Sequence, residues 1–351
     1  MKKAWMYLLT FCLLLACAGC GSSSSETTAA ESGGDTVTQG GSSSGFPAHD
    51  INGWVQWGAG GGTDNIMRPL CTYAEQLMGH SIIVNNKTGA SGAVATQFVH
   101  EQAADGYTLL LGAENPCLYK ILGISDLTYD NFDTVLLVGS EDLSLVVSPD
   151  SPYNTATDLI NAALEDPDGL LMATTGDGGS QWEAAAFIKA VTGASFTQVP
   201  FDGDATALTA VMGGNADLTT IKSTQAIEAQ RAGTVKILAT LTAEPVEALE
   251  GVPPIVEEYP GFADYLPFGP FYGVFVSEGT PADVVSTLSQ YFLDSFNNTE
   301  YQELLASMNI TPLGTVGEEA NQYIAAWQKS AATALYNAGV ISQSPEELGI
   351  Q

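Results

Sequence analysis

Four glycine-containing loops, each between a short apolar segment and an amphipathic segment, limit the possible folds most strongly. The first, residues 58–64, has the sequence Gly-Ala-Gly-Gly-Gly-Thr-Asp and follows a predicted strand at 51–57. The others lie at 89–92, 176–180 and 201–205. A strand, a tight turn and a helix in succession form the repeating unit of α/β folds with parallel strands. We therefore predict an α/β fold.

The order of the predicted elements divides the chain into two units. Strands and helices alternate from residue 51 to about 112, start again near residue 148 and return to the first unit at about residue 265. We predict one domain at 47–147 plus 265–351 and a second at 148–264, joined by two crossings. Ligands of open α/β sheets bind at the carboxyl ends of the strands, where the four loops lie. The pattern thus predicts a ligand cleft between two domains.

The charge of the chain excludes a large class of partners. It has 10 Lys+Arg against 40 Asp+Glu, a formal net charge of −30. Such a surface repels the phosphates of nucleic acid, and it also repels an anionic lipid surface. We expect no nucleic-acid partner.

The N-terminus has the charge order of a secretory signal. Lys2 and Lys3 precede an apolar run at 4–16, which is too short to span a membrane. The region 1–20 resembles a bacterial lipoprotein leader, with Cys17 as the lipidated residue and Cys20 as the alternative; a plain cleaved signal is the competing interpretation. Residues 21–46 are rich in Ser, Gly and Thr and predict a flexible tether. We expect an extracytoplasmic, lipid-anchored protein.

Metal, cofactor and nucleophile chemistry have little support in the sequence. Two cysteines lie beyond the leader, Cys71 and Cys117; an oxidising compartment would permit their pairing, but their spacing does not establish it. The three histidines are scattered, and neither HExxH nor CxxC occurs. Neither serine-containing glycine loop has the spacing of a nucleophile elbow. We expect no metal, no cofactor and no enzymatic activity.

The first glycine loop is suited to holding an anion. Glycines let the backbone approach a ligand closely, and the free N–H groups at a helix start carry about half a positive charge. The loop lacks the lysine of a phosphate-binding P-loop and the third glycine of a dinucleotide motif. The alternative is a plain turn in which Thr63 or Asp64 caps the helix. The same strand–loop–helix position at Gly179 and Ser180 extends the predicted site into the second unit.

Seven short motifs occur in order at 54–64, 84–92, 104–110, 199–203, 212–217, 251–254 and 272–282. Together they resemble one family, the tripartite tricarboxylate transporter solute receptors, also called Bug receptors. The resemblance covers about residues 50–340.

The resemblance implies a two-domain periplasmic-binding-protein fold of type II-like form, which closes on a small carboxylated solute. It implies delivery of the solute to a membrane permease with one large and one small subunit. In such receptors backbone amides and hydroxyls of the first two glycine loops hold the ligand carboxylate. The matching positions here are Ala59, Gly60, Gly61, Gly62, Thr63 and Asp64 in the first loop, and Ala90, Ser91 and Gly92 in the second.

Three acidic residues depart from simple tricarboxylate binding. Phe201-Asp202-Gly203 stands where the family often has Tyr-Lys-Gly, and Glu183 where a histidine is common. With Asp204 nearby, these carboxylates would repel a pure polycarboxylate. We expect a ligand with a positive or hydrogen-donating group besides its carboxylate, such as an amino acid; the alternative is that these side chains point to water or cap helices.

Two other functions share parts of this pattern. A sensory receptor has the same fold and site but passes a signal to its partner. An envelope hydrolase needs a nucleophile and a base within hydrogen-bond reach, which the sequence does not indicate.

Overall fold

The structure is a computed structural model that describes residues 45–201 and 203–350. The predicted signal region with Cys17 and Cys20, the tether as far as residue 44, and Asp202 lie outside the described residues. Within the two described ranges, no helix combines the length and apolarity that crossing a membrane requires.

A mixed six-stranded sheet forms the first part of the described chain. Its strands are β1 (Ile51–Val55), β2 (Ile82–Asn86), β3 (Thr108–Ala113), β4 (Phe132–Glu141), β10 (Phe271–Ser277) and β11 (Ile310–Thr315). They are ordered β11-β4-β10-β3-β1-β2. β1 is parallel to β2 and β3, whereas β10 is antiparallel to β3 and β4.

A five-stranded sheet forms the second part. Its strands are β5 (Leu143–Val147), β6 (Leu171–Thr174), β7 (Thr197–Pro200), β8 (Leu218–Lys222) and β9 (Lys236–Thr240). The order is β7-β6-β8-β5-β9, with β6 parallel to β7 and β8 and with β5 antiparallel to β8 and β9.

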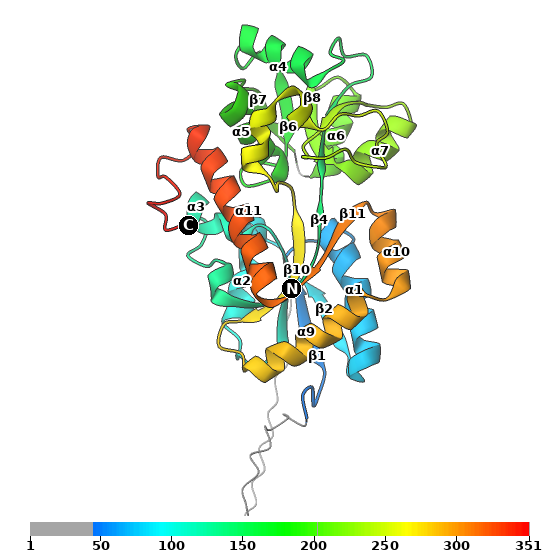
Figure 1. The fold of residues 1–351 in the computed structure, drawn as a ribbon, viewed down its shortest axis with the longest axis vertical. Coiled ribbons are helices and arrows are strands. Elements are labelled where there is room, and N and C mark those ends of the chain that lie inside the picture. Colours follow the sequence, from blue (N-terminus) through cyan, green and yellow to red (C-terminus); the bar gives the residue numbers. More distant parts are fainter. Residues whose placement is uncertain (1–44, 202, 351) are drawn as a thin grey trace, which may run out of the picture. The chain divides into compact units, whose positions relative to one another are not determined.

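Helices cover both faces of the first sheet (Figure 1). Alternate residues of β3 point to opposite faces: Leu109 and Leu111 belong to one buried cluster and Leu110 to another. The helices of the first cluster are α1 (Gly62–Met78), α9 (Ala282–Phe296) and α10 (Thr299–Ser307); those of the second are α2 (Ala93–His100), α3 (Pro116–Leu122) and α11 (Gly317–Asn337).

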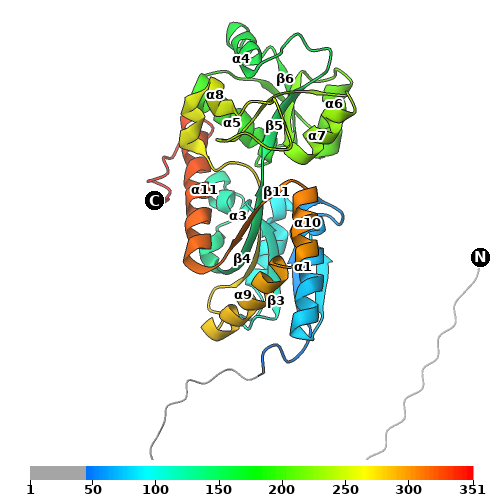
Figure 2. The ribbon, with the colours of Figure 1, turned by 45° about the vertical axis from the view of Figure 1, so that its right-hand side comes forward.

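The second sheet is covered in the same way (Figure 2). In β5, Leu145 and Val147 pack in one cluster and Val146 in another. The first of these faces carries α4 (Ala156–Glu165) and α5 (Ser180–Thr192), and the other carries α6 (Asp204–Met212) and α7 (Ser223–Arg231). Short helices α8 (Ile255–Glu258), η1 (Ala90–Gly92), η2 (Tyr129–Asn131) and η3 (Pro260–Tyr265) complete the described elements.

The amphipathic pattern explains the placement of α1. Its buried residues include Ile66, Met67, Leu70, Cys71 and Ala74, which recur at helical spacing on one face. Gly79, in the left-handed conformation with φ 72°, ends the helix.

Some elements differ from the sequence pattern. Strands β4 and β5 follow one another between 132 and 147, where the pattern predicts no element. Their residues are buried on both faces, so the apolar and polar residues do not alternate. The returning strand β10 is antiparallel, so the sheets are mixed rather than wholly parallel.

The chain passes from the first sheet to the second between Glu141 and Leu143. The prediction assigned 143–147 to the first domain, but β5 pairs with β8 and β9 of the second sheet. The return crossing lies beside the first, because the Glu141 amide donates to the carbonyl of Pro270 at 2.8 Å. Gly269 permits this approach: it has φ 113°, and a Cβ there would lie 2.3 Å from the Glu141 carbonyl oxygen.

Candidate functional site

A cavity of about 520 Å³ lies at the carboxyl ends of strands from both sheets. This volume lies in the range of pockets for small metabolites. Its lining comes from the segments after β1, β2, β3, β6 and β7, from the end of β8 and from the start of β10. The lining residues are Trp57–Thr63, Ser91, Ala113–Asn115, Thr175, Asp177–Ser180, Gly203, Asp204, Lys222, Pro270 and Tyr272.

Three helices begin at this cavity with a glycine N-cap. The caps are Gly61 before α1, Gly179 before α5 and Gly203 before α6, and none makes a side-chain capping hydrogen bond. In α1, Asn65 is the first residue whose backbone amide has an intrahelical acceptor; it donates to the Gly61 carbonyl at 2.9 Å. The preceding amides lack an intrahelical acceptor and carry the positive end of the helix dipole. The three helix starts therefore give the cavity an anion-binding lining.

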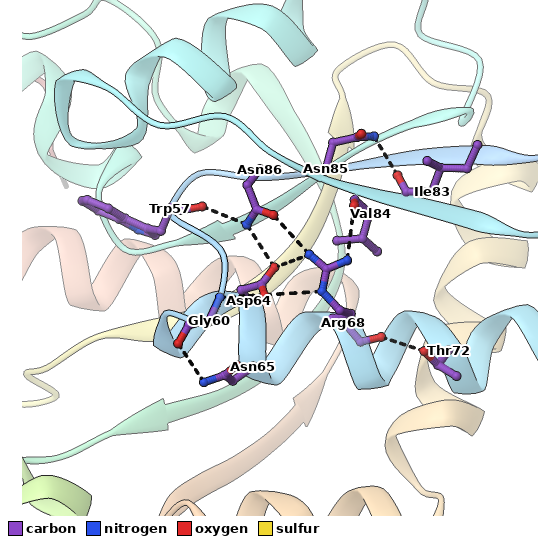
Figure 3. A network of polar contacts seen from close by, with 10 residues as sticks. All are labelled: Trp57, Gly60, Asp64, Asn65, Arg68, Thr72, Ile83, Val84, Asn85 and Asn86. Atoms are coloured by element: carbon purple, nitrogen blue, oxygen red, sulfur yellow. Dashed lines mark hydrogen bonds and ion pairs between the residues drawn. The ribbon is translucent and has the colours of Figure 1, made fainter.

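Asp64 does not line the cavity but holds the first loop in shape (Figure 3). Its carboxylate accepts from the Gly60 amide at 3.0 Å, from Arg68 Nη2 at 2.6 Å and from Asn86 Nδ2 at 3.0 Å. Burial raises the pKa of Asp64, but the hydrogen bonds from Arg68, Gly60 and Asn86 outweigh it and lower the pKa. Asp64 thus orients the loop whose amides face the cavity.

The second glycine loop contributes Ser91 alone to the cavity lining. Ala90 lines a separate depression, and Gly92 is buried. A Cβ at Gly92 would lie 3.0 Å from Tyr119 Oη and from Gln56 Cβ, so this glycine allows close packing beneath the loop. Tyr119 Oη donates to the Ser91 carbonyl at 2.9 Å and fixes the loop.

In the second part, Gly179, Ser180 and Asp204 line the cavity, whereas Glu183 does not. Glu183 is only 1% exposed, in the first turn of α5, where burial raises its pKa well above the usual value and the charge of Glu114 raises it further. The carboxylate expected from Glu183 is therefore buried behind the cavity wall. Asp204 accepts a hydrogen bond from Gln181 Nε2 at 2.7 Å.

Sequence reasoning missed the cation of the site, Lys222. Its Nζ lies 2.8 Å from the position of a Cβ built on Gly62, directly beside the start of α1. Nζ donates to Tyr272 Oη at 3.3 Å and lies 3.5 Å from Glu141 Oε2. Burial alone lowers the pKa of Lys222, but Tyr272, Glu141 and Asp204 raise it above the usual value. The ammonium therefore stays charged at neutral pH.

Sequence reasoning also missed Glu114 and Asn115, which follow β3. Glu114 is 7% exposed, and among the described residues its Oε2 has no hydrogen-bond partner. Burial raises the pKa of Glu114 to about 7, although its own backbone amide and Lys222 lower it. Asn115 is 3% exposed, with Oδ1 likewise unpartnered in the described structure.

The positions of Lys222 and Glu114 in the sequence could have indicated both residues. Lys222 follows Leu-Thr-Thr-Ile at 218–221 and ends strand β8, and Glu114 follows the apolar run Leu-Leu-Leu-Gly-Ala at 109–113 in strand β3. Both occupy the carboxyl end of a strand before a helix, which is the position shared by the four glycine loops. A glycine pattern does not identify ionisable residues in the same position.

The described residues contain no group of three or more His, Cys, Asp or Glu arranged to hold a metal ion. Cys71 and Cys117 are buried and free. Burial raises the pKa of Cys117 well above its usual value, so this thiol is a weak nucleophile. The geometry of the cavity suits reversible binding of an anionic solute.

Comparison with known proteins assigns the chain to a family. Residues 66–337 match the family model of the tripartite tricarboxylate transporter family receptor. A similar curated relative is Protein BugT of Bordetella pertussis, 25% identical over 292 residues, which cover 80% of this chain and 86% of that protein.

Solved structures share the fold. A TctC solute binding protein from Polaromonas has a TM-score of 0.69 at 24% identity and covers 84% of this chain and 98% of its own. MatC from Rhodopseudomonas palustris with bound malate has a TM-score of 0.69 at 23% identity, covering 82% and 100%. An R. palustris protein with adipate has a TM-score of 0.71 at 23% identity, covering 84% and 98%. The chain therefore belongs to the tripartite tricarboxylate transporter receptor family of solute-binding proteins and has the two-domain α/β fold of periplasmic binding proteins, as its motifs predict.

Proposed function

We propose that the protein captures a small carboxylated solute in the cavity at the carboxyl ends of its strands. The observation that carries this proposal is the meeting of the uncapped start of α1 with the Lys222 ammonium, 2.8 Å from a Cβ built on Gly62. Free helix amides and a half-buried cation are both favourable partners of a carboxylate. The uncapped starts of α5 and α6 face the same cavity.

The relatives support this class of ligand. Two proteins with the same fold hold malate and adipate, which are both dicarboxylates. The candidate contacts include Ala59–Thr63, Ser91, Gly179, Ser180 and Asp204, together with Lys222. Asp202, outside the described residues, remains a candidate by its place in the sequence beside Asp204.

Capture by domain closure forms part of the proposal. We place the domains at 47–141 plus 265–351 and at 143–264, with the first crossing at residue 142, because β5 pairs with strands of the second sheet. Contacts that a ligand makes with both domains stabilise the closed state, and only contacts specific to that state shift the equilibrium.

Delivery and location complete the proposal. The protein would pass its solute to the large and small membrane subunits of a tripartite transporter, which is the role that the name of its family implies. It would be extracytoplasmic and anchored by a lipid on Cys17, or alternatively on Cys20, as the leader at 1–20 predicts.

Lys222→Gln tests the carboxylate site. We expect the variant to bind acids at least about tenfold more weakly, because a hydrogen bond to a charged group contributes about 1.5–3 kcal/mol. Native mass spectrometry of the purified protein identifies any co-purified acid, and a thermal-shift panel of mono-, di- and tricarboxylic acids with their neutral amides selects ligands for calorimetry. Lys189→Gln is the matched control, because Lys189 is exposed on α5. Equal binding of acids and neutral amides, or no acid that raises the Tm, would contradict the proposal.

A further inference from the structure

Glu114 is an acidic group in the cavity that the capture of a carboxylate does not use. Two carboxylates near Glu114 have donors: Glu141 Oε2 accepts from Tyr272 Oη at 2.6 Å, and Asp204 Oδ1, in the cavity lining, accepts from Gln181 Nε2 at 2.7 Å. Asp177, which also lines the cavity, is exposed to solvent. Glu114 Oε2, by contrast, has no partner among the residues described. A buried oxygen without a donor is costly, so its presence at a binding cavity indicates that a ligand supplies the donor.

A second acceptor lies next to Glu114 in the chain. Asn115 also lines the cavity, and its Oδ1 is buried without a partner in the described part of the chain. The amide can turn to present either its oxygen or its nitrogen. Lys222, on the other hand, is a fixed donor beside the start of α1. The same cavity thus presents a cationic side and an unpaired acceptor side.

Resting on the function proposed above, we infer that the solute carries a hydrogen-bond donor, by preference an ammonium group, and that Glu114 selects it. The carboxylate of the solute binds at Lys222 and the α1 amides, and the ammonium binds at Glu114, with Asn115 as its neighbour. A solute with carboxylates alone would place like charges together at Glu114 in a partly enclosed cavity. The ligand class is an amino-bearing carboxylic acid.

The expected preference for an amino-bearing ligand depends on Glu114 and not on the residues that the sequence suggested. The sequence suggested Asp202, Asp204 and Glu183 as the acceptors. Glu183 is buried outside the cavity lining, and Asp204 already has a donor. Glu114 takes the place of Glu183 and Asp204 as the acceptor, whereas Asp202 lies outside the described residues and stays a prediction.

Binding of an ammonium at Glu114 depends on pH. Burial raises the pKa of Glu114 to about 7, so much of this carboxyl is protonated below that pH and cannot form an ion pair. The charge of Lys222 lowers the pKa of Glu114, whereas the charges of Asp204 and Glu141 raise it. The charge of Glu114 in turn raises the pKa of Glu183. Burial also raises the pKa values of the neighbouring thiol and phenols, which stay uncharged from pH 5.5 to 8: Cys117, Tyr119, Tyr129, Tyr272 and Tyr323.

Matched acid pairs test the inference by calorimetry. The probes are L-aspartate against succinate, L-glutamate against glutarate, and 4-aminobutyrate against butyrate. We expect the aminated member of at least one pair to bind about tenfold tighter or more at pH 8, and its affinity to fall by about tenfold from pH 8 to pH 5.5 as Glu114 takes up a proton. Glu114→Gln should abolish both effects, whereas Glu183→Gln should preserve both.

The outcomes separate this inference from the proposed function. If the unaminated acids bind as tightly as their aminated partners, the inference is overturned and the carboxylate receptor stands. Unchanged selectivity and pH dependence in Glu114→Gln, or their loss in Glu183→Gln, would remove Glu114 as the selecting residue. If no acid of either kind binds, the proposed function itself fails. Glu114→Met serves as a second variant if Glu114→Gln does not fold, since it keeps a similar volume without an acceptor.

Discussion

At the scale of single residues, Lys222 and Glu114 line one cavity with opposite charges. Lys222 has Tyr272 and Glu141 as partners at 3.3 and 3.5 Å, both longer than a strong charged hydrogen bond. Glu114 lacks a donor at Oε2 within the described residues. Such groups cost folding free energy, so their retention favours a role in binding over a role in stability.

The raised pKa of Glu114 predicts a pH-dependent gain in stability on its removal. The folded pKa is about 7 against a usual value of 4.5, so the folded state holds the proton more tightly than the unfolded state. The resulting loss of folding free energy is absent below about pH 4.5, grows as the pH rises to about 7 and is constant above that. Glu114→Gln should raise the free energy of unfolding by about 3 kcal/mol at pH 8 and by much less at pH 4.5.

Urea unfolding of the ligand-free protein at the two pH values measures this difference. Glu165→Gln is the matched control, because Glu165 is exposed at the end of α4, and it should change little at either pH. A Glu114→Gln variant that is less stable than the native protein at pH 8 would contradict the interpretation.

At the scale of elements, the three helices that begin at the cavity with a glycine share an uncapped start. Helices α4 and α10, which do not line the cavity, have side-chain caps at Thr155 and Asn298, whereas α2, α9 and α11, which do not line it either, also lack a side-chain cap. Helices α1, α5 and α6 begin at the cavity with glycine and have no side-chain cap. Glycine at an N-cap costs little, whereas a capping oxygen would occupy an amide that a ligand needs.

Gly61→Val tests the helix start of α1. The backbone there, at φ −74° and ψ 171°, accepts a side chain, but its Cβ would lie 3.1 Å from the Gly58 carbonyl and the branches would cover the amides. We expect the affinity for the bound acid to fall at least about tenfold, or about 1.4 kcal/mol, while the fold is kept. Calorimetry and circular dichroism measure the two quantities.

A cap on a distant helix provides the control. Thr155→Ala removes the capping box of α4, so it should lower stability by about 1 kcal/mol without a change in affinity. Native affinity in a folded Gly61→Val protein would place the carboxylate away from α1.

At the scale of the whole molecule, a net charge of −30 coexists with the proposed anion site. The proposed site is favourable because helix dipoles and the half-buried Lys222 ammonium act at short range, whereas the surface carboxylates are screened by solvent. Helix α11 packs on β4 of the first sheet and also contacts α5 of the second. Its Trp327 Nε1 donates to the Gly269 carbonyl at 2.8 Å, beside the crossings.

Joint replacement of Cys17 and Cys20 by serine tests the anchor. Without a cysteine to accept a lipid, the acidic body should leave the membrane fraction, because it has no other attraction to an anionic lipid surface. Fractionation followed by immunoblotting measures the release, and each single replacement identifies the acceptor. Retention of the double variant in the membrane fraction would rule out the lipid anchor.

Much of the fold could be predicted from periodicity. The strand predicted at 51–57 agrees with β1 at its start, and the glycine loops predicted at 58–64, 176–180 and 201–205 lie at the starts of α1, α5 and α6. The middle segment 132–147 could not be assigned, since strands buried on both faces lack alternation. Antiparallel pairing of β10 and the membership of β5 in the second sheet depend on contacts between residues far apart in the chain.

The α/β class and the glycine-rich helix starts could be predicted from the sequence alone, because backbone conformation and hydrophobic period are local properties. The family could be predicted from the resemblance of seven short motifs in order. Which groups share the cavity depends on the tertiary structure. Lys222 and Gly62 are 160 positions apart, yet folding places the Lys222 ammonium beside the helix start at Gly62. Packing of the elements around one another also buries Glu183 outside the cavity lining and leaves Glu114 Oε2 without a hydrogen-bond partner among the described residues.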